Sequence, residues 1–132
     1  MMAAGLLTIA HDSAGPKLDI ITPAVRCNSD GHSEMPDVKS SQEFLKTMDA
    51  ATEDTSIEIP EFPVGMLASD ASGFAQLISA ALDAEGPVEQ AMLRAARHVA
   101  TTRFSEASFC TDFYKKFSPV VRWLDIQRSD DE

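Results

Sequence analysis

The chain has 132 residues, 44% hydrophobic and 24% charged, which is the size and composition of one globular domain. Its formal net charge of −10 repels nucleic-acid phosphates and anionic lipid at long range, which argues against direct nucleic-acid binding and membrane-surface binding. No run approaches the roughly 18–20 apolar residues that cross a bilayer, and the first basic residue is Lys17, so the N-terminus does not resemble a secretory signal. A cytoplasmic protein is expected, with entry into the nucleus possible by diffusion.

Residues 1–39 predict a flexible or irregular acidic arm, because prolines and turn-forming residues interrupt every apolar run. Two short stretches in the first half, 18–22 and 56–59, have the composition of β-strands and could pair with each other. The run Leu18-Asp19-Ile20-Ile21 also resembles a SUMO-interacting motif, which adds a short strand to the edge of a sheet.

The first predicted helix covers residues 40–52. Ser40 and Glu43 have the spacing of a capping box, in which each side chain satisfies a free backbone N–H at the helix start. One apolar face then follows, made by Phe44, Leu45, Met48 and Ala51.

A second helix is predicted after Ser69 or Asp70, either of which can serve as its N-cap. Its apolar stripe has the full spacing of a core-facing helix and consists of Phe74, Leu77, Ile78, Ala81 and Leu82. Gly86 followed by Pro87 predicts the end of this helix and the start of the next one. The next helix presents Val88, Met92, Ala95, Ala96, Val99 and Ala100.

Ser105 predicts the cap of a further helix with a ladder of phenylalanines at positions 109, 113 and 117. The pair Ser118-Pro119 predicts the start of a last short helix that includes Val120 and Ile126. The fold class expected is therefore mainly α: a small helical bundle within a domain at 40–128, preceded by the arm and followed by a polar tail at 129–132. A core this small is marginal, so the helix at 40–52 or a partner would complete it.

No arrangement of residues in the sequence predicts chemistry. Cys27 and His32 offer two metal ligands where a structural zinc site needs four. A pairing of Cys110 with His98 would need a reactive, partly exposed thiol, whereas the flanking phenylalanines indicate a buried one. We therefore expect no catalytic residue, no metal site and no cofactor, and we predict that the protein is not an enzyme.

The distribution of charge offers one candidate site. The segment 94–128 holds seven basic and three acidic residues within a chain of net charge −10. A solvated helix surface would explain this, as would a basic patch that meets an acidic partner or the protein's own acidic half. The candidate interaction patch consists of Arg94, Arg97, Arg103, Lys115, Lys116, Arg122 and Arg128.

These observations predict a non-enzymatic protein–protein interaction, regulatory or adaptor module, either free-standing or the N-terminal part of a larger signalling protein. Its partner would be another protein or a second copy of the chain. The alternative is an acidic inhibitor that imitates nucleic acid and blocks a basic cleft on an enzyme, although the basic segment argues against it. A small enzyme that uses Cys110 or His98 is the third reading.

Overall fold

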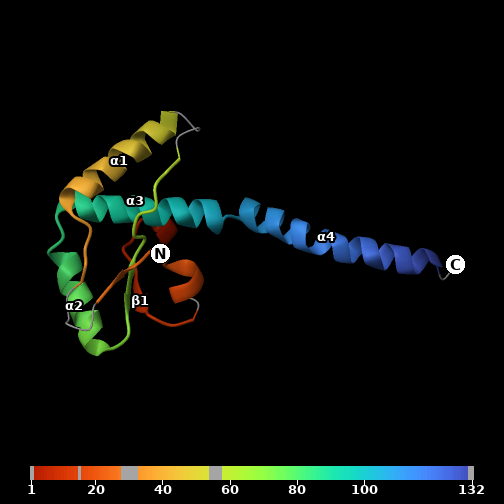
Figure 1. The fold of residues 1–132 in the computed structure, drawn as a ribbon, viewed down its shortest axis with the longest axis horizontal. Coiled ribbons are helices and arrows are strands. Elements are labelled where there is room, and N and C mark those ends of the chain that lie inside the picture. Colours follow the sequence, from red (N-terminus) through yellow and green to blue (C-terminus); the bar gives the residue numbers. More distant parts are fainter. Residues whose placement is uncertain (1, 15, 28–32, 54–57, 131–132) are drawn as a thin grey trace. The chain divides into compact units, whose positions relative to one another are not determined.

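The structure is a computed structural model that describes residues 2–14, 16–27, 33–53 and 58–130, with the backbone alone described at Asp19, Glu53 and 123–130. The chain divides into two compact units, unit 1 (Met1–Val99) and unit 2 (Ala100–Glu132). The described part is mainly helical, which confirms the predicted fold class, and Figure 1 shows its helices and strands in chain order.

Unit 1 contains a small parallel sheet that the sequence analysis did not predict. Its strands are β1 (Ile9–His11), β2 (Val25–Arg26) and β3 (Met66–Ala68), in the order β1-β3-β2. The first residues of β1 and β2 both pair with the first residue of β3, so the carboxyl ends of all three strands lie at the same edge. The division into an arm at 1–39 and a domain from residue 40 stays a prediction, and two of the three strands come from that arm.

The central strand is short and apolar on both faces. All of its side chains are buried, as are the flanking residues Val64 and Gly65. A Cβ atom added at Gly65 would lie 2.7 Å from the backbone oxygen of Thr8 and 2.9 Å from Cγ2 of Ile21. The chain therefore needs glycine at this position, where the segments that precede β1 and β2 approach β3 most closely.

Residues 2–27 are largely irregular, as predicted, but the predicted strand at 18–22 is wrong. A short 3-10 helix forms at Met2–Ala4, and Pro16–Ile20 form a π-helical turn. Ile21 is only 1% exposed, so the run that resembles a SUMO-interacting motif is neither extended nor free to join another sheet. Of the other predicted strand, residues 56–57 lie outside the described residues, and residues 58–59 have no regular structure.

Helix α1 (Val38–Glu53) begins two residues before the predicted start. Its N-cap is Asp37 and not Ser40: one carboxylate oxygen of Asp37 accepts from the Ser40 N–H at 2.9 Å, and the other accepts from the Ser40 hydroxyl at 2.7 Å. These hydrogen bonds, led by the one from the hydroxyl, lower the pKa of Asp37. The buried Phe44 stacks on Phe62 with ring centroids 4.5 Å apart, which anchors α1 to the segment that leads into β3.

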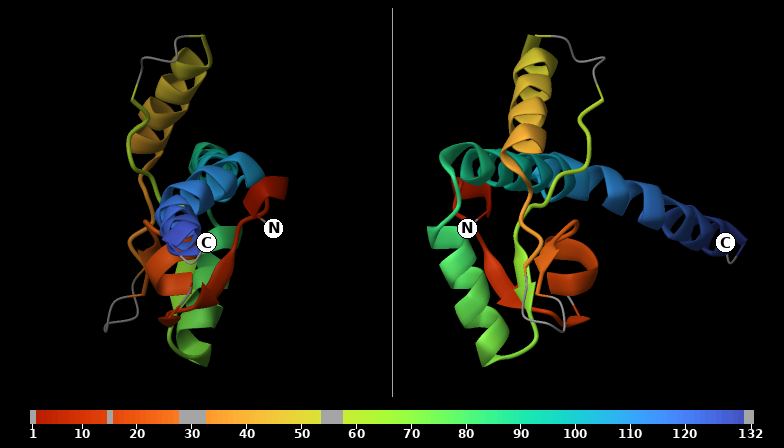
Figure 2. Two further views of the ribbon diagram at one scale, coloured as in Figure 1. Left: turned by 90° about the vertical axis from the view of Figure 1, so that its right-hand side faces the viewer. Right: turned by 60° about the vertical axis from the view of Figure 1, so that its left-hand side comes forward.

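Helix α2 (Ala71–Leu82) is capped by Asp70, one of the two predicted caps, whose carboxylate accepts from the Gly73 N–H at 2.7 Å. The helix lies beside the sheet and contacts β3 and β1 (Figure 2). Leu77 is fully buried in this contact, but Ile78 is 48% exposed and Leu82 is 81% exposed. The predicted stripe is thus too wide, because only one side of α2 meets the small sheet.

Helix α3 (Gly86–Arg103) has Pro87 in its first turn, as predicted. Four of its six predicted apolar residues are buried: Val88, Met92, Ala95 and Ala96. Together with β3 and Leu77, this face makes the core of unit 1. Among the described side chains, every buried one lies between Met2 and Ala96.

Helix α4 (Glu106–Asp130) is one continuous helix, so the predicted break at Ser118-Pro119 is wrong. Ser105 caps it as expected, since its hydroxyl accepts from the Ser108 N–H at 3.1 Å. Pro119 lies inside the helix and, having no N–H, leaves the Lys115 carbonyl without its usual i+4 donor. None of the helices in the described part of the chain is both long and apolar enough to span a membrane.

Candidate functional site

A polar pocket lies at the carboxyl edge of the sheet, where parallel strands commonly place ligand sites. Its volume is about 290 Å3. The residues that follow the three strands meet the first turns of α2 there, because all three strands run in the same direction. The lining residues are Asp12, Arg26, Cys27, Leu67, Ala68, Ser69, Asp70, Ser72, Gly73 and Gln76.

Asp12 is the best shielded charge in this pocket, with its side chain 14% exposed. Its N–H donates to the Ala68 carbonyl at 2.8 Å, which fixes the residue directly after β1. Nζ of Lys17 lies 3.4 Å from one carboxylate oxygen, and Nε of Arg26 lies 3.5 Å from the other. The Asp12 carboxylate is therefore shared between two basic side chains.

Among the described residues, two buried oxygens of the pocket accept no hydrogen bond, Asp12 Oδ1 and Gln76 Oε1, whereas other polar groups bond within the chain. The half-buried Cys27 thiol donates to the Gly73 carbonyl at 3.7 Å, and the Gln76 amide donates to the Ser72 hydroxyl at 3.3 Å. Nucleophilic catalysis needs a general base in reach of the nucleophile, and no histidine lines this pocket in the described part of the chain.

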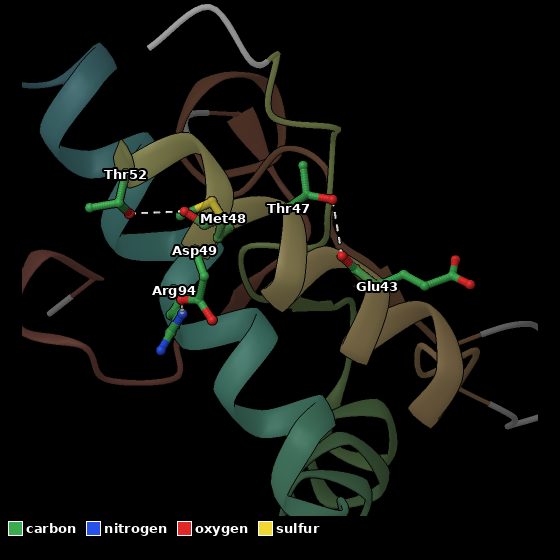
Figure 3. A network of polar contacts seen from close by, with 6 residues as sticks. All are labelled: Glu43, Thr47, Met48, Asp49, Thr52 and Arg94. Atoms are coloured by element: carbon green, nitrogen blue, oxygen red, sulfur yellow. Dashed lines mark hydrogen bonds and ion pairs between the residues drawn. The ribbon is translucent and has the colours of Figure 1, made fainter. Parts of the chain in front are cut away.

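The predicted basic patch is divided between the two units. Arg94 and Arg97 lie on α3 in unit 1, where Arg94 forms an ion pair with Asp49 of α1 (Figure 3). The Arg94 side chain is 48% exposed and the Asp49 side chain is 69% exposed, so the pair adds little stability but occupies the guanidinium. Arg97 is exposed and makes an interaction of its own.

The other members of the predicted patch belong to unit 2. The guanidinium of Arg103 lies 5.4 Å from the centroid of the Phe104 ring, within cation–π distance. Lys115, Lys116 and Arg122 are exposed on α4. The Arg128 side chain lies outside the described side chains. The seven residues are thus split between two helices, Arg94, Arg97 and Arg103 on α3 and the other four on α4.

The histidine and cysteine candidates belong to different parts of the chain. His32 lies outside the described residues, so the Cys27 and His32 pair cannot be placed. His98 belongs to unit 1 and makes an interaction of its own, whereas Cys110 is half-buried in unit 2. Among the described residues, no three metal-ligating side chains gather in one place.

Helix α4 presents a continuous aromatic face. Phe109 is 66% exposed, Phe113 43% and Phe117 49%. Their rings stack on one another along the helix, with centroids 5.9 Å apart for the first pair and 4.4 Å for the second. Three further exposed apolar side chains adjoin or extend this stack: Tyr114, Val120 and Val121. We call these six residues the aromatic face of α4.

The central strand and the pocket had signals that the sequence analysis missed. A run of apolar residues at 64–68 lies between Pro63 and Ser69-Asp70, which is the pattern of a buried parallel strand. Asp12 similarly follows the mildly apolar stretch at 6–10. Recognising both runs as strands would have placed these polar residues together at one edge of a sheet.

Comparisons with protein-family models, with curated proteins and with solved structures gave no match, so the residues of the chain itself are the basis for interpreting its function.

Proposed function

We propose that the chain is a non-enzymatic protein–protein interaction module of the regulatory or adaptor type, and that the aromatic face of α4 is its contact surface. One observation above all supports this proposal: three stacked phenylalanines remain about half exposed or more on a helix that buries none of its described side chains. Monomeric soluble proteins rarely expose contiguous apolar patches unless the patches bind something.

Burial of the aromatic face of α4 against a partner would be favourable, because it removes apolar surface from water. Burial of an apolar surface yields about 25 cal/mol per Å2, and an aromatic side chain offers a large area. Aromatic residues are also enriched among the side chains that dominate binding energy at interfaces. The buried residues of the described chain all lie before Val99, in unit 1.

The polar pocket at the sheet edge supports a binding function less well. Its one well-shielded carboxylate, Asp12, already pairs with Lys17 and Arg26, so a cationic ligand would have to displace one of these side chains. The aromatic face needs no such exchange.

Site-specific photocrosslinking in the native cell tests the proposal. A photoreactive phenylalanine analogue at Phe113 is expected to give adducts with polypeptides. The same analogue at Lys115, which lies on another side of α4, is the matched control and is expected to give few. An absence of adducts at Phe113, or equal adducts at both positions, would contradict the proposal.

A further inference from the structure

We infer that the aromatic face of α4 binds the same face of a second copy of the chain, with the two α4 helices antiparallel. This inference rests on the proposed function and names its partner. The observations that support it are the order of charges along α4 and the place of two of these charges beside the phenylalanine ladder.

The charges of α4 are segregated between Glu106 and Arg122. Acidic residues come first in this segment, Glu106 and Asp112, and basic residues follow, Lys115, Lys116 and Arg122, whereas the sequence beyond it holds both signs, Asp125, Arg128 and Asp130. Two parallel copies would set Lys115 and Lys116 beside their own counterparts. Antiparallel copies that pair over Glu106 to Arg122 instead set the acidic start of this segment in one helix beside its basic end in the other, which favours association.

The helical repeat of about 100° per residue places these charges around the aromatic face. Phe109, Phe113 and Phe117 cover one side of α4. Asp112 and Lys116 lie one turn apart on the same flank of that side, and both are exposed. In a twofold antiparallel pair, equivalent flanks of the two helices meet each other.

One alignment of the two antiparallel helices pairs opposite charges and also brings the phenylalanine rings into contact. If the twofold axis passes near Tyr114, Asp112 of each copy lies opposite Lys116 of the other. The same register sets Phe113 of each copy beside Phe113 and Phe117 of its partner. The structure thus offers two symmetric ion pairs next to a buried cluster of aromatic rings.

Charge reversal with mixing tests this register on the full chain. Lys116→Asp leaves Asp opposite Asp, and Asp112→Lys leaves Lys opposite Lys, so each variant alone is expected to raise the dissociation constant of the dimer on the order of tenfold. Mixed in equal amounts, the two variants pair opposite charges at both sites. Sedimentation and native mass spectrometry are expected to show a heterodimer with near wild-type affinity.

The mixing step excludes an effect within one helix. An ion pair between residues 112 and 116 of the same chain would be lost in both variants and could not be recovered by mixing them. Lys115→Asp, on another side of α4, is the matched control and is expected to leave the dimer almost unchanged.

Two results would overturn the inference: a wild-type chain that stays monomeric at all concentrations, or a mixture that associates no more tightly than either variant alone. Neither result touches the proposed function, because photocrosslinking at Phe113 to a different polypeptide would still support it. Adducts of Phe113 with the chain itself, at twice its mass, would support both.

Discussion

Leu77 of α2 and Phe113 of α4 look alike in the sequence, because each belongs to an apolar stripe at helical spacing. Leu77 is fully buried against the sheet, whereas Phe113 is 43% exposed. The difference arises from what each helix meets: α2 contacts β3 and β1, and α4 buries none of its described side chains. A helical stripe therefore predicts that a face will be covered, but not whether the same chain covers it.

Alanine substitutions at Leu77 and Phe113 should differ most in their effect on the free energy of unfolding. Leu77→Ala is expected to lower the free energy of unfolding by about 2–5 kcal/mol, because it leaves a cavity in the core of unit 1. Phe113→Ala is expected to change it by less than about 0.5 kcal/mol, since the side chain is exposed. Urea denaturation in dilute protein, where association does not add stability, measures both. Equal losses would show that α4 is part of the same core.

Gly65→Ala probes the tightest contact within unit 1. The added methyl group would meet the Thr8 backbone oxygen at 2.7 Å, so the strands must shift and stability is expected to fall by about 1–3 kcal/mol. Gly86→Ala is the matched control, because a Cβ atom there has nothing within 4 Å. Thermal unfolding of both variants measures the effect. A Gly65 variant as stable as the Gly86 variant would contradict the close approach.

Asp70→Ala removes the cap of α2 and is expected to cost about 1 kcal/mol, since the Gly73 N–H loses its acceptor. Asp70→Asn keeps a side-chain oxygen at the same place and should remain close to the wild type. Denaturant midpoints compare the two variants. If Asn were as damaging as Ala, the carboxylate would have another role, for example in the adjoining pocket.

The smallest predicted effect concerns Asp37, which caps α1. Because its pKa is lowered in the folded state, this carboxylate adds stability above the ordinary pKa of an aspartate, and that stability is lost as the pH falls through the lowered value. Asp37→Asn keeps an acceptor but cannot titrate. Unfolding midpoints measured across the acid range should therefore depend less on pH in this variant, and an unchanged dependence would contradict the assignment.

The sequence predicts the helices well because their periodicity and caps are local signals. Asp70, Pro87 and Ser105 each lie at the helix start that their residue type indicates. The boundary at Pro119 fails because a proline inside a helix loses one hydrogen bond without always ending the helix.

The sheet and the site are harder to predict, since they depend on contacts between distant segments. Strands of two or three residues leave little periodicity, and β3 is buried on both faces, so no alternation marks it. The exposure of Phe109 and Phe117 likewise depends on what packs against α4, which no local pattern encodes. The basic patch was defined by charge along the sequence and is divided between two units in the fold.

Amide hydrogen exchange of the full chain at two protein concentrations tests the central claim most directly, namely that α4 presents a binding surface and not a part of the unit 1 core. We predict that amides of α2 and α3 near Leu77 and Met92 are protected equally at both concentrations. Amides between Glu106 and Arg122 should exchange rapidly in dilute protein and become protected at high concentration. Protection of α4 that equals that of Leu77 at every concentration would contradict the account.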